Sequence, residues 1–232
     1  MENSNYKENL LWLLEHIKEK GARSKKAIIY CRSIDSVAEV FVTMKEYIGP
    51  YAYIDQKEDS QHLLIEMFHR STHQSSKERI LDNFRRKDGS IRCIVATVAL
   101  GMGMDIRDVD FVLHFGCPKS VVTYWQEAGR CARDGRNGIS VILYNKFTTN
   151  MKTASKDIAT IVTNVERKCI RKQILQHLSI AHKDANEPAT ICKGCEDVLC
   201  QCSSCKCCCV CIEKCPCFEH TNFTVRNFLS CE

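Results

Sequence analysis

Two arginines near the middle of this 232-residue chain have the type and spacing for chemistry on a phosphate group. Arg130 and Arg133 are three residues apart, so a helix that Ser120 caps and that continues through them would present both on one face. Guanidinium groups keep their charge and suit a polyphosphate, where an arginine stabilises phosphoryl transfer. The competing interpretation is that both are solvated side chains at a helix end.

A turn rich in glycine forms the second candidate site. Gly101 and Gly103 allow the backbone to turn tightly and to approach a ligand closely. Asp105 follows two residues later, and its carboxylate suits hydrogen bonds from a ribose. Two glycines so close together also commonly only shape a loop. The pattern predicts either a nucleotide-binding loop or a turn with a purely structural role.

The elements that position these residues follow from apolar, β-forming runs that alternate with helical segments. Strands are expected at residues 27–31, 64–69, 92–97, 111–115 and 139–144. Runs buried on both faces and separated by helices are typical of an α/β fold, with a mostly parallel sheet and helices on both faces. In such folds ligands bind at the loops beyond the carboxyl ends of the strands, and the candidate motifs fall there.

Helices are predicted by apolar spacing and by capping residues. Residues 1–24 carry apolar residues at helical spacing up to Gly21, and are expected to form a docking helix. A helix from Ser33 to about residue 47 follows the first strand. Ser75 and Glu78 have the spacing of a capping box, which places the start of another helix there.

Composition places the chain among ordinary globular proteins. The 33 basic and 28 acidic residues give a formal net charge of +5, which allows nucleic-acid binding but also arises from scattered solvated lysines. The N-terminus does not resemble a secretory signal, and no window reaches about 18 uninterrupted apolar residues, so no membrane partner is expected. The expected location is the nucleus in a eukaryote, and otherwise the cytoplasm.

Cysteines divide the chain into two parts. Twelve of the 17 lie between Cys192 and Cys231. In a chain without a secretory signal, such a cluster favours metal binding over disulfides. A domain boundary is therefore expected between about residues 150 and 190.

Three segments together resemble motifs IV, V and VI of superfamily 2 helicases, in particular those of the RecQ family of 3′ to 5′ DNA helicases. They are IIYCRS at 28–33, VATVALGMGMDIRDVDFVLHF at 95–115 and YWQEAGRCARDG at 124–135. The Gln-Glu-x-Gly-Arg form that begins at Gln126 is closer to RecQ proteins than to the His-Arg form of DEAD-box RNA helicases. The resemblance covers about residues 25–215 and implies a RecA-like lobe.

The resemblance implies a role for each matching residue at the nucleotide. Arg130 and Arg133 would be arginine fingers, and Gln126 would position the motif that carries them. Asp105, with the glycines of its turn, would hold the ribose of ATP.

The same resemblance implies a single-stranded or forked DNA partner, with Ser33 and Thr97 contacting phosphates of the tracking strand. One departure concerns the second arginine, because RecQ proteins usually have Ala-Gly where this chain has Cys131 and Ala132. The added methyl group occupies a tight position, which affects how Arg133 fits its site.

RecQ helicases continue from the second motor lobe into a helical, four-cysteine zinc platform, so the resemblance implies a structural Zn²⁺. The expected ligands are Cys169, Cys192, Cys202 and Cys205. A pair separated by two residues suits a chelating turn around a tetrahedral ion. Cys195 and Cys200 are alternatives for the later positions. The many remaining cysteines leave open a low-complexity tail that binds metal adventitiously.

The sequence contains no G-x-x-x-x-G-K-[ST] loop and no Asp-Glu-x-His strand end. In this family both belong to a first motor lobe, which cradles the phosphates and holds the magnesium. ATP with Mg²⁺ is therefore expected to bind only when such a lobe is present, and the chain alone is expected to be inactive.

The expected organisation is a docking helix at 1–24, a helicase C-terminal lobe at 25–150, a helical zinc-binding subdomain at 151–211 and a cysteine-containing tail at 212–232. The implied function is that of the motor lobe of an ATP-hydrolysing DNA helicase in unwinding, recombination and repair. Two other functions stay open: a non-catalytic remnant that binds nucleic acid or a helicase, and a cysteine-rich metal buffer.

Overall fold

The computed structural model describes residues 6–101, 106–150, 152–179 and 207–214. The chain divides into two compact units. The first consists of the residues up to Gly116 together with Trp125–Asn145, and the second of Cys117–Tyr124 together with the residues from Lys146 onward. Among the described residues, no helix combines the length and the apolar character needed to cross a membrane.

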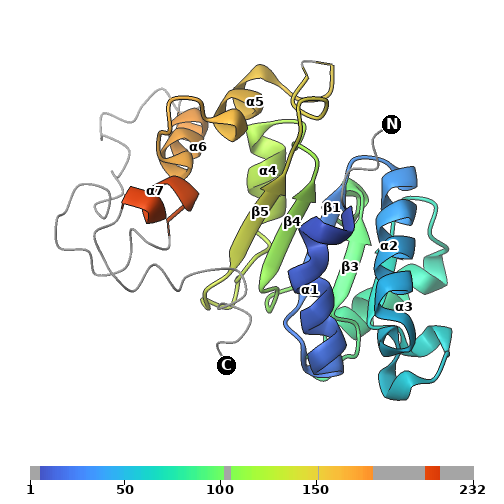
Figure 1. The fold of residues 1–232 in the computed structure, drawn as a ribbon. Helices are drawn as coiled ribbons and strands as arrows, with labels where there is room; N and C mark the ends of the chain where they lie inside the picture. The colour runs from blue at the N-terminus through green and yellow to red at the C-terminus, as the bar shows by residue number, and fades with distance from the viewer. Residues whose placement is uncertain (1–5, 102–105, 151, 180–206, 215–232) are drawn as a thin grey trace. The chain divides into compact units, whose positions relative to one another are not determined.

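A five-stranded parallel sheet forms the centre of the first unit (Figure 1). Its strands are β1 (Ala27–Cys31), β2 (Ile65–Phe68), β3 (Cys93–Ala96), β4 (Phe111–Phe115) and β5 (Ile139–Leu143). They lie in the spatial order β2-β3-β1-β4-β5, and every neighbouring pair is parallel. The predicted parallel sheet is confirmed, and each predicted strand boundary agrees to within one residue.

Burial explains why these segments form the interior of the sheet. Every residue of β1 and β3 is buried, because apolar runs such as AIIYC and CIVA can be covered on both faces. β1 lies between β3 and β4, with Ile29 opposite both Val95 and Leu113. The strand order changes direction there, so the loops after β1 and β3 lie at the place where such sheets bind ligands.

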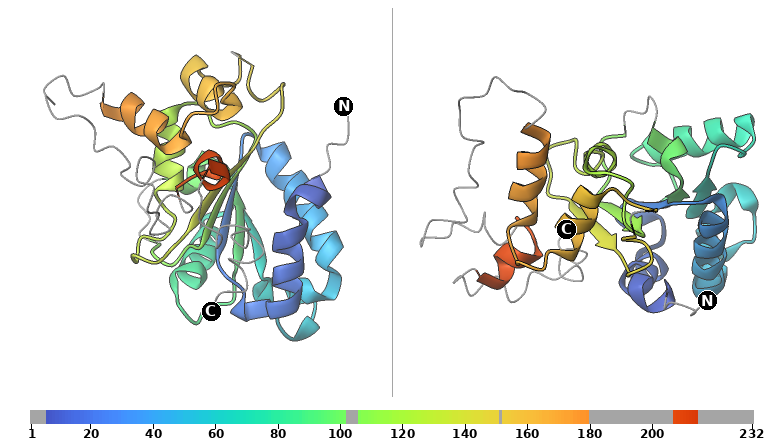
Figure 2. Two further views of the ribbon diagram at one scale, coloured as in Figure 1. Left: turned by 60° about the vertical axis from the view of Figure 1, so that its left-hand side comes forward. Right: turned by 90° about the horizontal axis from the view of Figure 1, so that it is seen from above.

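Helices cover both faces of this sheet, as predicted for a RecA-like lobe. α1 (Tyr6–Lys20) packs against α2 (Ile34–Ile48) on one face, and α3 (Gln74–Arg85) covers the other (Figure 2). The buried face of α1 consists of Leu10, Leu13, Leu14 and Ile17. Short 3₁₀ turns lie at Gly21–Arg23, Gly49–Ala52, Ile54–Gln56, Ser60–His62 and Val98–Gly101.

The start of α3 differs from the sequence prediction. His73 occupies the N-cap position, so Ser75 lies inside the first turn. The Ser75 hydroxyl and the His73 Nδ1 are hydrogen-bonded at 2.7 Å, and Glu78 accepts a bond from Gln74 Nε2 at 2.8 Å. The predicted capping box is therefore wrong, because both of its side chains bond to neighbouring side chains instead of the backbone at the helix start.

The outer strand β2 carries one buried acid. Glu66 is 6% exposed, and its carboxylate accepts a hydrogen bond from Arg79 of α3 at 2.6 Å. Burial raises the pKa of Glu66, and the guanidinium opposes that rise. The ion pair links this edge of the sheet to the helix that covers it.

The second unit is helical in its described part. It contains α5 (Lys156–Thr163), α6 (Ile170–Ser179) and α7 (Cys209–Lys214). Ser155 precedes α5, and Asn164 ends it in the left-handed conformation at φ 42°. α5 and α6 contact each other and contribute the buried residues Ile158, Ile161 and Ile174. A small helical part that follows the sheet agrees with the predicted fold class.

Candidate nucleotide-binding and metal sites

The two residues predicted to contact DNA lie at the carboxyl ends of neighbouring strands. Ser33 follows β1 and Thr97 follows β3, and these strands pair directly. The Ser33 hydroxyl caps α2 by accepting a hydrogen bond from the Ser36 N–H at 3.1 Å. The Thr97 hydroxyl accepts one from the Ala99 N–H at 3.4 Å. Both hydroxyls are therefore held in place beyond the carboxyl ends of the strands.

The glycine-rich turn lies only partly within the described residues. Gly101 ends the 3₁₀ turn that begins at Val98. Gly103 and Asp105 lie outside the described residues, so their contact with a ribose stays a prediction. The description resumes at Ile106, which is 2% exposed and packs in the core beneath α3.

Helix α4 (Val121–Ala128) leads toward the two arginines. Ser120 caps it, as predicted, because its hydroxyl accepts a hydrogen bond from the Thr123 N–H at 3.1 Å. Gln126, which was predicted to position the motif, is exposed on this helix.

The helix ends before it reaches either arginine. The Arg130 N–H bonds to the carbonyl of Glu127, only three residues back, at 3.1 Å. This tighter pattern, together with the low helix propensity of Gly129, ends the α-helix. The prediction that Arg130 and Arg133 share a helical face is therefore wrong, since both lie in the turn after α4.

Arg130 belongs to a buried polar cluster in the first unit. The members of this cluster are Tyr30, His114, Glu127 and Arg130, and none is more than 6% exposed. His114 Nε2 and Glu127 Oε2 are 3.0 Å apart, and the His114 ring stacks on Tyr30 with 5.6 Å between centroids. Burial raises the pKa of Tyr30, and the nearby Arg130 guanidinium opposes that rise. The cluster holds the end of α4 against β1 and β4.

Arg133, in contrast, has an exposed side chain. Its Nε donates a hydrogen bond to the carbonyl oxygen of Gly129 at 2.9 Å, which fixes the side chain against the end of α4. The two arginines of the motif thus have different surroundings: Arg130 is internal, and Arg133 faces the surface.

The two residues that depart from the RecQ pattern separate these arginines. Ala132 has a φ of +54°, in the left-handed region that favours glycine, and a side chain there costs roughly 1–2 kcal/mol. The Cys131 Sγ donates to the carbonyl oxygen of Asp110 at 3.2 Å, and burial raises the pKa of this thiol to about 12. The departure therefore adds backbone strain at position 132 and an unreactive thiol at position 131.

Four thiols gather in the described part of the second unit. The sulfur atoms of Cys169, Cys207, Cys208 and Cys211, here called the cysteine cluster, all lie within 4.8 Å of one another. The Sγ atoms of Cys169 and Cys207 are 3.6 Å apart. Thiolates bound tetrahedrally at about 2.3 Å from Zn²⁺ would be about 3.8 Å apart, so the arrangement fits such an ion. Hydrogen bonding within the cluster raises the pKa of Cys207 and lowers that of Cys208.

Cys169 directly precedes α6, and its Sγ accepts a bond from the Lys172 N–H at 3.4 Å. Side chains outside the cysteine cluster link this segment to the one that carries the other three thiols. Arg167 forms an ion pair with Glu213 of α7. The Lys214 ammonium donates to the carbonyl oxygen of Arg167 at 3.0 Å. The two segments are thus held together by polar contacts in addition to the thiols.

The cysteine cluster shares one residue with the ligands predicted from the sequence, Cys169. The other predicted ligands and their alternatives lie outside the described residues: Cys192, Cys202, Cys205, Cys195 and Cys200. The pair Cys208 and Cys211 has the same CxxC spacing that singled out Cys202 and Cys205. That spacing was the available signal, and by itself it does not choose between the pairs.

Comparison with known proteins agrees with this architecture. Residues 8–135 match the helicase conserved C-terminal domain, so the chain belongs to that family. Within that family it is similar to several RecQ-named helicases, as the three sequence motifs predicted. The ATP-dependent DNA helicase hus2/rqh1 of Schizosaccharomyces pombe is 29% identical over 172 residues, covering 73% of this chain and 12% of that protein.

Two further relatives match a shorter part of this chain. The putative ATP-dependent DNA helicase Q1 of Caenorhabditis briggsae is 35% identical over 126 residues, covering 50% of this chain and 19% of the relative. The ATP-dependent DNA helicase RecQ of Pasteurella multocida is 29% identical over 124 residues, covering 53% and 17%. The chain thus spans 12% to 19% of the length of these relatives.

Among solved structures, the helicase Lhr of Mycobacterium smegmatis bound to ssDNA and AMP-PNP gives a TM-score of 0.49 at 19% identity, over 69% of this chain and 19% of that one.

Proposed function

We propose that this chain supplies the second motor lobe of an ATP-driven 3′ to 5′ DNA helicase, in which Arg133 acts as an arginine finger. The observation that carries the proposal is the turn after α4, which exposes Arg133 beside a helix end anchored in the core. An arginine brought to the γ-phosphate of ATP stabilises the charge of the transition state and contributes roughly 10³- to 10⁵-fold in rate.

Arg130 is proposed to have a structural role. Its burial beside Tyr30 and Glu127 suits it to hold the turn on the sheet. Contact between Arg130 and the nucleotide, which the family resemblance predicts, would require its side chain to leave the buried polar cluster when a first lobe closes. Gln126 keeps the proposed role of positioning the motif from the exposed side of α4.

ATP and Mg²⁺ are proposed to bind only together with a first motor lobe. The sequence has neither a phosphate-cradling loop nor the acidic strand end that holds Mg²⁺. The contribution of this chain is then Arg133 on the phosphates and the turn at residues 101–105 on the ribose.

A reconstituted motor tests this proposal. A first lobe from a RecQ helicase, added separately or fused ahead of Met1, should give DNA-stimulated ATP hydrolysis, and Arg133→Ala should lower turnover roughly 10³-fold or more. The matched control is Arg85→Ala, because Arg85 is also an exposed arginine near a helix end, 3.5 Å from Asp82. Equal turnover in the Arg133→Ala variant and the unaltered chain would contradict the proposal.

Ser33 and Thr97 are proposed to contact phosphates of one DNA strand, which would make binding independent of base sequence. Support comes from their adjacent places at the carboxyl ends of β1 and β3. Ser33→Asp separates this role from helix capping, because Asp caps a helix as well as Ser does, while its charge repels a phosphate.

The Ser33→Asp variant should therefore keep its thermal stability and lose affinity for single-stranded DNA. Gln61→Glu is the control, since it adds the same charge at an exposed position ahead of β2, at the opposite end of the strands. If both variants bind a fluorescent oligonucleotide equally well, Ser33 does not contact DNA.

The cysteine cluster is proposed to hold a structural Zn²⁺. Its four sulfur atoms all lie within 4.8 Å of one another, which suits them to bind one tetrahedral ion. Because such a site does not exist in the unfolded chain, ion binding would add directly to the stability of the second unit.

A non-catalytic module that binds DNA or a helicase is the second candidate function. The strained Ala132 next to Arg133 favours it, because a turn that departs from the family pattern presents the arginine less well. Such a module would bind single-stranded DNA with an affinity that falls steeply with salt, and no first lobe would give it ATPase activity. Action in recombination and repair belongs to the first proposal and follows from the family resemblance, with a nuclear location in a eukaryote and a cytoplasmic one otherwise.

A further inference from the structure

The turn that carries Arg133 is hydrogen-bonded to the segment that leads into β4. The Ala132 N–H donates to the carbonyl oxygen of Val109 at 2.8 Å, and the Asp134 N–H donates to that of Arg107 at 3.2 Å. The turn that carries Arg133 is therefore supported by backbone hydrogen bonds to Arg107 and Val109.

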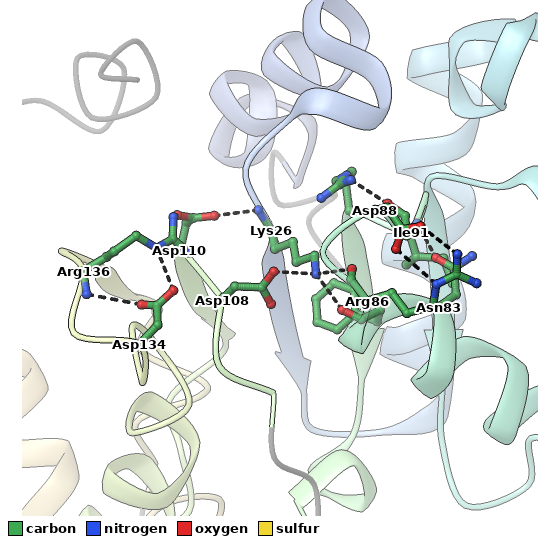
Figure 3. A network of polar contacts seen from close by, with 12 residues as sticks. Lys26, Asn83, Arg86, Asp88, Ile91, Asp108, Asp110, Asp134 and Arg136 are labelled. Carbon is green, nitrogen blue, oxygen red and sulfur yellow. Dashed lines mark hydrogen bonds and ion pairs between the residues drawn. The ribbon is translucent and has the colours of Figure 1, made fainter.

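Arg136 joins the same two segments through its side chain (Figure 3). Its Nη1 donates to Asp110 Oδ1 at 3.0 Å, and its Nε donates to Asp134 Oδ2 at 2.6 Å. Asp110 directly precedes β4, and Asp134 lies in the turn. One guanidinium thus bridges the start of a central strand and the turn that carries Arg133.

Asp110 is a fixed anchor for this bridge. The residue is 5% exposed, and its other oxygen accepts a hydrogen bond from the backbone N–H of Lys26, just ahead of β1, at 2.9 Å (Figure 3). Burial raises the pKa of Asp110, while the Lys26 N–H and the Arg136 guanidinium oppose that rise. Loss of Arg136 would remove a cation that faces this buried carboxylate.

We propose that Arg136 is a positioning residue for Arg133, holding the turn in the arrangement that presents the Arg133 side chain to a nucleotide. Ala132 has a backbone conformation that persists only where its surroundings impose it. The bonds from Arg136 to Asp110 and Asp134 help to impose this backbone conformation on Ala132. The glycine of the RecQ pattern would adopt the same conformation with less support from its surroundings. The inference rests on the proposed motor function, because it needs a nucleotide for Arg133 to contact.

The test compares Arg136→Met with Arg136→Lys in the chain reconstituted with a first motor lobe. Arg136→Met should lower kcat for ATP by roughly tenfold to 100-fold and leave KM for ATP unchanged, because a displaced finger weakens transition-state contacts more than binding. Arg136→Lys should recover part of the loss, since a lysine keeps the charge but reaches one carboxylate at a time. The control is Arg86→Met, which removes an exposed arginine that pairs with Asp88 at 2.8 Å.

A second measurement follows the turn itself. Hydrogen exchange of the peptide that contains Ala132 and Asp134 should become roughly tenfold faster in Arg136→Met alone, without any nucleotide. Normal kcat or unchanged exchange in Arg136→Met would overturn the positioning role. Absence of turnover in the unaltered chain would instead overturn the proposed motor function, and the role of Arg136 in turnover with it.

Discussion

The turn after α4 and the cysteine cluster are organised in opposite ways. The turn is held by a parallel sheet and by the buried polar cluster, so its arrangement depends on contacts that form when the lobe folds. The cysteine cluster lies among short helices, and its thiols come from segments nearly 40 residues apart, at Cys169 and from Cys207 onward. In the first region the fold creates the site. In the second, a bound ion would help to create the fold.

Removal of metal should give the largest difference between the two regions. Cys169→Ser, or a chelator, is expected to release the metal and to remove roughly 10 kcal/mol of stability from the second unit, which should then become sensitive to protease. The sheet of the first unit should keep its thermal transition. Metal content by mass spectrometry, together with mapping of protease cuts, makes the measurement.

Cys209→Ser is the matched control for this experiment. Cys209 is an exposed thiol on α7 that does not belong to the cysteine cluster. If both serine variants lose metal equally, the ligand set is not the one described. If neither change affects protease resistance, the second unit folds without an ion, and the contrast between the two regions disappears.

Truncation of Glu127 should give the next largest loss of stability, and this loss should occur in the first unit. Glu127→Ala leaves the buried His114 without the carboxylate 3.0 Å away, and the loss of a buried hydrogen-bond partner typically costs roughly 1–3 kcal/mol. Urea unfolding measures the loss, and metal content should not change. Glu39→Ala removes an exposed glutamate from α2 and should have almost no effect. A loss below about 1 kcal/mol in Glu127→Ala would mean that the buried polar cluster does not hold the turn.

Relief of strain at Ala132 should give the smallest effect, and it should raise the stability of the first unit instead of lowering it. Ala132→Gly is expected to stabilise the first unit by about 1 kcal/mol, because glycine adopts a φ of +54° without a steric penalty. Ala128→Gly makes the same chemical change at the end of α4 and should destabilise the chain by about 0.5–1 kcal/mol. Thermal unfolding of the two variants distinguishes them. A loss of stability in both would show that the turn is not strained.

The sequence contained most of what positions the candidate nucleotide site. All five strands were predictable from short β-forming runs, and the runs of β1 and β3 are apolar throughout, as suits strands covered on both faces. The caps at Ser33 and Ser120 were equally local, since each hydroxyl bonds to a backbone N–H three residues later. The capping box predicted at Ser75 does not form, and the reason is also local: the Ser75 hydroxyl is hydrogen-bonded to the His73 ring instead of the backbone.

The remaining features depend on contacts between distant residues. Tyr30, His114 and Glu127 look like ordinary polar residues until the sheet brings their segments together, so nothing in the sequence predicts that Arg130 is buried with them. The cysteine cluster was ambiguous for a different reason. Cysteines recur at every third position from Cys202 to Cys211, and the same CxxC pattern therefore fits several ligand sets.

The buried carboxylate of Glu66 has a consequence for self-association. An outer strand has unpaired backbone groups along one side, and these recruit strands from other molecules. A charged side chain that points inward from such a strand makes this pairing unfavourable, and β2 is in addition only four residues long. Concentrated solutions of the chain should therefore resist aggregation through this edge, and Glu66→Val would remove that protection.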